Sequence, residues 1–263
     1  MDLSLRRLSL AGMLRPLIRL LRWLATRLHG LYRALGLFLV IALILALGGL
    51  WVFAEIAGDV MSGQTARFDE AILQWMHAHG TSSLDKWALQ ITAIGNGASV
   101  IALGLVLCGF LWVLRYRLAV LLLVMGVFGA DLGNRVLKST FDRPRPELFV
   151  IDTPHARPTS ASFPSGHATA AMALFLIVAY LLSKLGGRGV FRVASIGLAV
   201  ALILAIGVSR VYLGVHYPSD VIAGFLFGFV WVNLCIFGLE AVRVIRGRSQ
   251  ARGAVLKGAD TTG

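Results

Sequence analysis

Ionisable side chains lie between two apolar runs in the stretch from Ser209 to Asp220. This stretch contributes Arg210, His216 and Asp220. Charged and titratable groups at the edge of a membrane are costly unless they are paired or hydrated, so they are functional candidates. Pro218 and the serine after it predict the start of a helix, with Asp220 in its first turn. The spacing of four residues allows Asp220 to orient the His216 imidazole and to leave its second nitrogen free for chemistry.

A second stretch, residues 138–146, reads KSTFDRPRP and contributes cations. The guanidinium of Arg145 is a planar fork for phosphate oxygens, and the ammonium of Lys138 is a point charge. The same side chains are also compatible with a simpler interpretation, in which they extend to lipid headgroups at the membrane surface.

A third stretch, Pro164-Ser165-Gly166-His167, precedes an apolar run. Ser165 is a good N-cap, and the free backbone N–H groups at a helix start form an anion site. Gly166 lets the backbone approach a ligand closely, and His167 adds a titratable group. Taken alone, this stretch is also compatible with an ordinary helix cap followed by a structural histidine.

Six apolar runs predict an all-α integral membrane protein with six transmembrane helices. Of the 263 residues, 57% are hydrophobic and 14% are charged, whereas soluble domains carry about a quarter charged residues. The predicted spans lie in a single membrane domain, residues 34–243, and each is close to the length that crosses a bilayer. They are Leu35–Ala54, Ile91–Leu114, Leu118–Val136, His167–Leu182, Val193–Val208 and Val221–Val242.

Three segments outside these runs have their own character. Residues 1–33 carry seven arginines opposite a leucine stripe, which predicts an amphipathic helix on anionic lipid headgroups; a basic, solvated extension is the alternative. Residues 55–90 predict one or two short amphipathic helices on the outer surface, with Trp75 and Trp87 at headgroup depth. Residues 244–263 form a basic polar tail that we expect to be disordered.

The distribution of basic residues predicts the orientation of the chain. The net charge is +12, but the cations flank apolar runs, which argues against nucleic acid as a partner. With the N-terminus inside, the inner segments hold seventeen of the 25 Lys and Arg residues, and the outer segments hold the remaining eight. Both termini are then cytoplasmic, as expected for a bacterial inner-membrane protein. All three candidate stretches fall on the outer, periplasmic side.

Together the three stretches predict a site for phosphoryl transfer. Such transfer depends mainly on positioning and on charge stabilisation, which the cations and the helix-start amides provide. One histidine would attack phosphorus, and the other would protonate the leaving oxygen and later activate water. No carboxylate cluster typical of a magnesium site is apparent, so we expect chemistry without a metal or other cofactor. Asp131, Asn134 and Arg135 either shape a substrate mouth or are ordinary polar residues at a helix end.

These stretches resemble the three signature motifs of the type 2 phosphatidic acid phosphatase family, which is related to vanadium-dependent haloperoxidases and bacterial acid phosphatases. The family pattern is K-x6-R-P, then P-S-G-H, then S-R-x5-H-x3-D. Every signature position is present here, and the resemblance extends over about Asp131–Phe229. It implies that His216 forms a phosphohistidine, that His167 is the general acid and that Asp220 orients His216. The residues that it implies for phosphate binding are Lys138, Arg145, Ser165, Gly166 and Arg210.

The resemblance predicts a lipid phosphate phosphatase that vanadate inhibits. The six-span layout looks most like the bacterial enzymes that act on undecaprenyl pyrophosphate and phosphatidylglycerophosphate. Phosphatidic acid and the 1-phosphate of lipid A are further candidate substrates. Two alternatives belong to other classes: a lipid phosphotransferase, which would use the same histidines, and a non-enzymatic protein that binds or moves lipid. The sequence leaves the oligomeric state open.

Overall fold

The computed structural model describes residues 36–37, 40–147, 160–185 and 189–260, and within these residues every regular element is a helix. The chain divides into two compact units, Leu43–Leu239 and the two ends Met1–Ala42 with Glu240–Gly263. All three candidate stretches belong to the first unit. The predicted N-terminal amphipathic helix lies outside the described residues.

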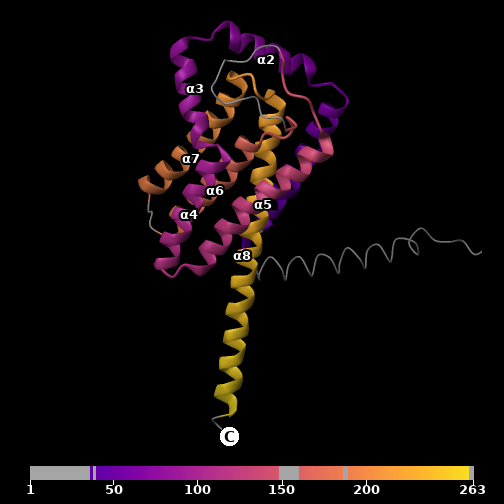
Figure 1. The fold of residues 1–263 in the computed structure, drawn as a ribbon. Coiled ribbons are helices and arrows are strands. Elements are labelled where there is room, and N and C mark those ends of the chain that lie inside the picture. The colour runs from indigo at the N-terminus through magenta and orange to yellow at the C-terminus, as the bar shows by residue number, and fades with distance from the viewer. Residues whose placement is uncertain (1–35, 38–39, 148–159, 186–188, 261–263) are drawn as a thin grey trace, which may run out of the picture. The chain divides into compact units, whose positions relative to one another are not determined.

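The helices are labelled in chain order (Figure 1). A first helical span covers Val40–Met61. The labelled helices are α2 (Ala66–Ala78), α3 (Ser82–Ile94), α4 (Gly97–Val113), α5 (Arg117–Phe141), α6 (Gly166–Leu185), α7 (Val190–Tyr212) and α8 (Pro218–Asp260). Residues 142–165 separate α5 from α6. Residues 244–260, which we expected to be disordered, continue α8 as a helix.

Five of these helices are long and apolar enough to cross a membrane, and α3 with α4 makes a sixth span if the bent pair counts as one. This confirms an all-helical integral membrane protein. The second predicted span, Ile91–Leu114, is wrong as a continuous helix because the chain bends by 47° between α3 and α4. Asn96 causes the break, since its side chain accepts a hydrogen bond from the N–H of Ser99 at 2.7 Å and so caps a new helix.

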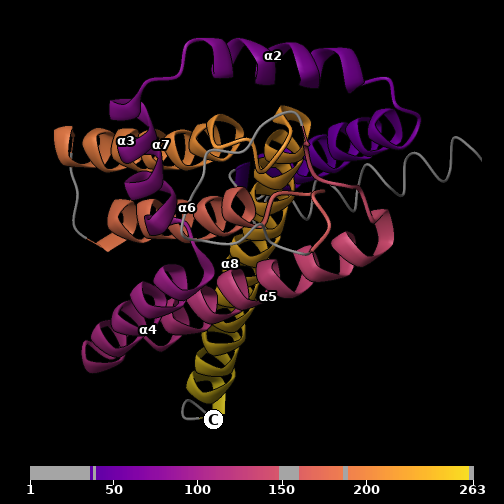
Figure 2. The same cartoon turned by 45° about the horizontal axis from the view of Figure 1, so that its top comes forward.

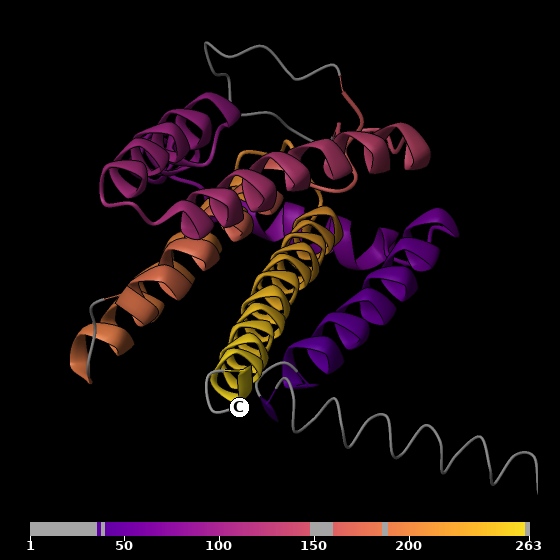
Figure 3. The same ribbon diagram turned by 90° about the horizontal axis from the view of Figure 1, so that it is seen from below.

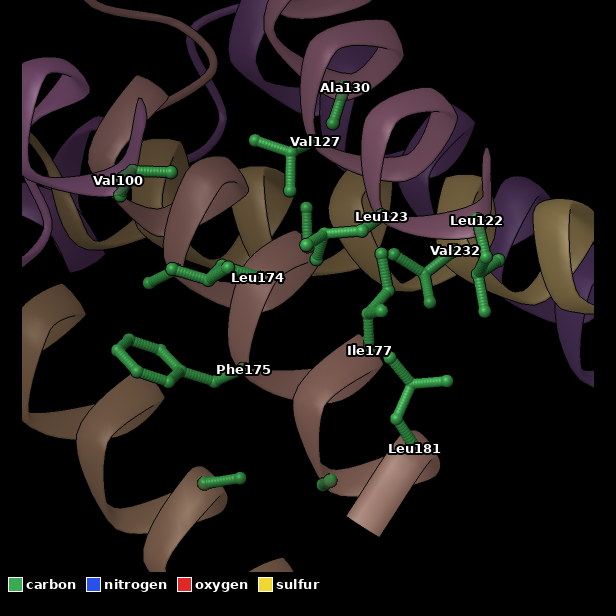
Figure 4. Packing of buried hydrophobic residues seen from close by; sticks show 14 of the residues in the cluster. Val100, Leu122, Leu123, Val127, Ala130, Leu174, Phe175, Ile177, Leu181 and Val232 are labelled. Carbon is green, nitrogen blue, oxygen red and sulfur yellow. The ribbon is translucent and has the colours of Figure 1, made fainter. Parts of the chain in front are cut away.

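The main buried cluster contains residues from α4, α5, α6, α7 and α8. Leu122 and Leu123 of α5 pack toward Ile177 of α6 and Val232 of α8, and all four are at most 2% exposed (Figure 4). Seen from below, the Val40–Met61 span runs beside α8 (Figure 3). Many large apolar side chains on the outside of the helices are exposed, which is what a lipid-facing surface requires.

The helix α2 crosses one end of the helices in the first unit (Figure 2). Leu73 of α2 is fully buried in a cluster with Ala168 of α6, Val211 of α7 and Val221 of α8. Between residues 55 and 90, where we predicted one or two short helices, residues 55–61 continue the first span, and α2 and the first part of α3 follow. The candidate residues lie at the ends of α5 and α7 and at the starts of α6 and α8.

Close approach between α8 and the start of α6 depends on Gly224. A Cβ atom at this position would lie 2.6 Å from the backbone oxygen of Ser165, which cannot move without moving the helix start. We expect Gly224→Ala to lower the free energy of unfolding by about 1–3 kcal/mol, as overpacking does. Denaturant unfolding in detergent micelles measures this. Gly238→Ala in the same helix is the control, since a Cβ there meets nothing within 4 Å and the change should be neutral or stabilising. Equal stability of the two variants would contradict the expectation.

Candidate active site

The local structure of each stretch explains how its side chains reach a common place. The helix α5 runs to Phe141, longer than predicted, so Lys138 lies in its last turn. Asp142 then adopts the left-handed conformation (φ 40°), its N–H bonds to the Lys138 carbonyl at 3.0 Å, and the chain leaves the helix toward Arg145. Arg210 lies in the last turn of α7, and Gly214, at φ 69°, makes the turn before His216.

The three stretches meet in space. Lys138 lies within electrostatic range of Arg145, Arg210 and Asp220. His167, in the first turn of α6, lies within range of Lys138, Arg145, Arg210 and His216. The backbone of the second and third stretches is also joined directly, since the N–H of Ser165 donates to the carbonyl of Asp220 at 2.9 Å.

The hydrogen bonds of His216 define its tautomer. Its Nε2 lies 3.2 Å from Nη1 of Arg145, which can only donate, so Nε2 is the acceptor. Its Nδ1 then carries the proton and faces Oδ2 of Asp220 at 3.4 Å and Oγ of Ser162 at 3.3 Å. Ser162 in turn donates to the same Asp220 oxygen. Burial lowers the pKa of His216 to about 3, although Asp220 acts in the opposite direction, so the ring is neutral near pH 7.

The cations near His216 also bind backbone carbonyls, some just before the Pro164–His167 stretch and one just before His216 itself. Arg145 donates from Nε to the carbonyl of Ser160 at 2.9 Å and from Nη1 to the carbonyl of Val215 at 2.7 Å. Lys138 donates to the carbonyls of Ala161 and Ser162. Burial lowers the pKa of Arg145, but a guanidinium stays charged in proteins.

Two polar atoms at the site are buried without a hydrogen-bond partner among the described residues: Oγ of Ser165 and Nε of Arg210. Sequence analysis predicted Ser165 as an N-cap, yet its hydroxyl makes no cap bond, and only its carbonyl accepts from the N–H of Thr169 at 3.0 Å. Arg210 is anchored by a bond from Nη1 to Oγ1 of Thr92 at 2.8 Å. Because buried donors are normally paired, these two atoms point to a ligand that accepts hydrogen bonds.

A second group of residues, which sequence analysis missed, surrounds Asp220. Arg143 donates to Oδ1 of Asp220 at 2.7 Å and to Oδ2 of Asp69 at 2.8 Å. Ser219 accepts from Arg143 at 2.8 Å and donates to Asp69 at 2.6 Å. Both carboxylates are fully buried. Removing one partner from such a buried ion pair typically costs about 3–5 kcal/mol, because a buried charge is left without compensation.

Of the three residues predicted for a substrate mouth, only Asn134 faces the interior. Its amide donates to the carbonyl of Pro164 at 3.3 Å and to Oγ1 of Thr169 at 3.1 Å, so it supports the Pro164–His167 stretch. Asp131 and Arg135 pair with each other at 2.8 Å, and both side chains are more than half exposed. A role for these two at a substrate mouth stays a prediction.

Arg143 was detectable in principle, because it is a cation among the unspecified positions of K-x6-R-P, two residues before Arg145. Asp69 and Thr92 lie far from the motifs in sequence and gave no signal of their own. No group of three or more His, Cys, Asp or Glu side chains suited to a metal ion occurs within the part of the chain that the structure describes. Chemistry without a metal stays a prediction.

Parts of the chain are similar in sequence to known proteins. The PAP2 superfamily matches residues 117–241. Phosphatidylglycerophosphatase B of Bacillus subtilis (strain 168) is 39% identical over 109 residues, which cover 41% of this chain and 52% of that protein. Lipid A 1-phosphatase of Rhizobium johnstonii is 39% identical over 114 residues, covering 41% of this chain and 42% of that protein. The chain thus matches about half of the length of these curated relatives.

Structural similarity extends further along the chain than these sequence matches. The crystal structure of a transmembrane PAP2-type phosphatidylglycerolphosphate phosphatase from Bacillus subtilis superposes with a TM-score of 0.67 at 27% identity. The superposition covers 72% of this chain and 93% of that one. The signature residues, their convergence at the helix ends and these similarities lead to one conclusion: this chain is a multi-pass membrane protein whose residues 117–241 match the PAP2 superfamily.

Proposed function

We propose that this protein is a phosphatase that hydrolyses the phosphate group of a membrane lipid through a phosphohistidine intermediate. The observation that carries the proposal is the meeting of two histidines with buried donors that lack a partner. His216 presents an Nε2 lone pair, and Ser165 and Arg210 present the donors. A tetrahedral phosphoryl group has the oxygens to accept from these donors and the phosphorus for the lone pair to attack.

The proposed reaction has two steps. In the first, Nε2 of His216 attacks phosphorus, the bond from phosphorus to the lipid oxygen breaks, and His167 gives that oxygen a proton. The ring of His216 becomes positively charged while Nδ1 keeps its proton, and Asp220 stabilises that charge. In the second step, His167 takes a proton from water, the water oxygen bonds to phosphorus and the bond to Nε2 breaks. Phosphate is released and His216 is neutral again.

The phosphoryl oxygens would be held by the cations and by the start of α6. Lys138, Arg145 and Arg210 supply positive charge, and Ser165 and Gly166 supply a hydroxyl and backbone N–H groups. Lys138 and Arg145 would exchange some of their bonds to backbone carbonyls for bonds to the ligand. Charged donors placed where charge develops in the transition state are the main source of rate enhancement for this chemistry.

Phosphatidylglycerophosphate is the first candidate substrate, because two of the similar proteins carry that activity in their names. Undecaprenyl pyrophosphate is the second, from the six-span layout, and lipid A 1-phosphate the third, from the Rhizobium relative. The excess of Lys and Arg in the segments opposite the site supports a bacterial inner-membrane location with cytoplasmic termini and a periplasmic site.

A panel of lipid phosphates in detergent micelles tests the proposal. Phosphate release from at least one of phosphatidylglycerophosphate, undecaprenyl pyrophosphate, phosphatidic acid and lipid A supports it, and the relative kcat/KM values rank the substrates. The activity should persist in EDTA and decrease with vanadate. Transfer of the phosphate to an added acceptor lipid, with none released, would instead identify a phosphotransferase. Movement of labelled lipid across vesicles without any phosphate release would identify a lipid-moving protein.

A further inference from the structure

The carboxylate of Asp69 is fully buried, although α2 is a short helix outside the segment that the PAP2 superfamily matches. It accepts the backbone N–H of Ser219 at 2.9 Å and the Ser219 hydroxyl at 2.6 Å, so it caps the first turn of α8 from a different helix. It also accepts from Nη2 of Arg143 at 2.8 Å. Asp69 thus joins α2 to the turn of α8 that contains Asp220.

Arg143 lies between the two carboxylates and fixes the orientation of Asp220. Its Nη1 donates to Oδ1 of Asp220. The other oxygen, Oδ2, accepts from the N–H of Tyr217 at 2.9 Å and faces Nδ1 of His216. The guanidinium carbon lies 4.1 Å from the centre of the Tyr217 ring. Bonds on both Asp220 oxygens leave the carboxylate little freedom to rotate away from His216.

We propose that Arg143 and Asp69 are positioning residues for the nucleophile, acting through Asp220 rather than on the phosphate. The proposal rests on the proposed phosphatase function. Arg143 compensates the charge of Asp220, so that this carboxylate accepts a hydrogen bond from Nδ1 of His216 without removing the proton. Asp69 fixes the orientation of the guanidinium toward Asp220, because the Asp69 carboxylate accepts hydrogen bonds both from Arg143 and from the start of α8.

Two other roles are compatible with the same contacts and predict different results. If Asp69 and Arg143 only stabilise the fold, their replacement lowers the amount of folded protein but leaves the chemistry of His216 unchanged. If α2 only covers the bound lipid, replacement raises KM and leaves kcat unchanged. A positioning role changes kcat and the titration of His216 instead.

The experiment compares Arg143→Gln, Arg143→Lys and Asp69→Asn with the full-length wild type in detergent micelles. Arg67→Gln and Glu70→Gln are matched controls, because both residues are exposed on α2. Steady-state kinetics use the most active lipid of the panel in a dioctanoyl or similar short-chain form. We expect Arg143→Gln to lower kcat by about 10- to 100-fold, the usual effect of removing a group that orients a functional side chain, with KM nearly unchanged. Arg143→Lys should recover part of this loss, and Asp69→Asn should lower kcat by roughly 10-fold.

A measurement on His216 itself does not depend on activity. Nitrogen-15 NMR of labelled histidine, assigned with His216→Gln, reports the tautomer and the pKa of the ring. Arg145, Arg210 and His167 also lie within electrostatic range of His216, and they are the same in every variant. Loss of the Arg143 charge leaves Asp220 less compensated, which favours the charged imidazole. The pKa of His216 should therefore rise in Arg143→Gln, and the acid limb of kcat/KM should move to higher pH. It should not rise in Asp69→Asn, which removes a negative charge.

Three results would overturn the proposal: unchanged kcat and His216 titration in Arg143→Gln, a change in KM alone, or equal effects in the two control variants. Thermal unfolding of each purified variant separates loss of folded protein from loss of chemistry. A wild type that releases phosphate from no lipid in the panel would contradict the proposed function. The titration of His216 in Arg143→Gln would still decide whether Arg143 positions it.

Discussion

Replacing His216 with alanine should lower phosphate release by about 10⁴-fold or more, the scale observed when a nucleophile that acts as part of a unit is removed. The ring supplies the only Nε2 lone pair that faces Arg145 at 3.2 Å among the described residues, and alanine offers nothing that can attack phosphorus. Phosphate release and trapping of radioactive phosphoenzyme at short times measure the effect.

His79→Ala is a suitable control for this variant. His79 is an exposed histidine at the end of α2, and its Nδ1 lies 2.8 Å from the carbonyl oxygen of Trp75. Its replacement should leave the rate within about twofold of the wild type, as expected for a surface change away from special features. Normal turnover by His216→Ala would show that phosphorus is attacked by another group, and the phosphohistidine mechanism would be wrong.

Replacing His167 with alanine should lower kcat on lipid substrates by about 10²- to 10⁴-fold, the usual contribution of general acid–base catalysis. The alkoxide of a lipid leaves poorly without a proton, whereas a nitrophenolate leaves without one. The loss in the first step should therefore be much smaller with p-nitrophenyl phosphate than with a lipid. Hydrolysis of the intermediate still needs a base, so phosphohistidine should accumulate in this variant.

Rapid-quench measurement of phosphoenzyme with the two kinds of substrate tests the role of His167. A burst of nitrophenolate followed by slow turnover is the expected result. An equal loss of rate on both substrates, with no phosphoenzyme, would contradict a general acid role. It would favour His167 as a residue that only binds phosphate.

The sequence predicted the long helices and the signature residues because both are local patterns. Lys138 and Arg145 stand seven residues apart, and His216 and Asp220 four apart, so one turn or one helix end fixes each pair. The convergence of the three stretches followed from the topology, since alternate ends of successive spans fall on one side of the membrane.

The remaining features depend on contacts between distant parts of the chain. Asp69 contacts Ser219, which is 150 residues away in the sequence, and no periodicity or spacing predicts such a contact. The break between α3 and α4 was missed for a different reason. Ile91–Leu114 is apolar throughout, and a hydropathy average does not register that a single asparagine can cap a new helix there.

That break also bears on the affinity of the site. Thr92 lies one turn before the bend, and its hydroxyl accepts from Arg210 at 2.8 Å. A free arginine side chain carries about 2 kcal/mol of rotamer entropy, which a bound anion would otherwise have to remove. Because Thr92 and burial already restrict Arg210, that ordering occurs once, when the protein folds. Under the proposed function, a phosphate would therefore meet a guanidinium that is preorganised.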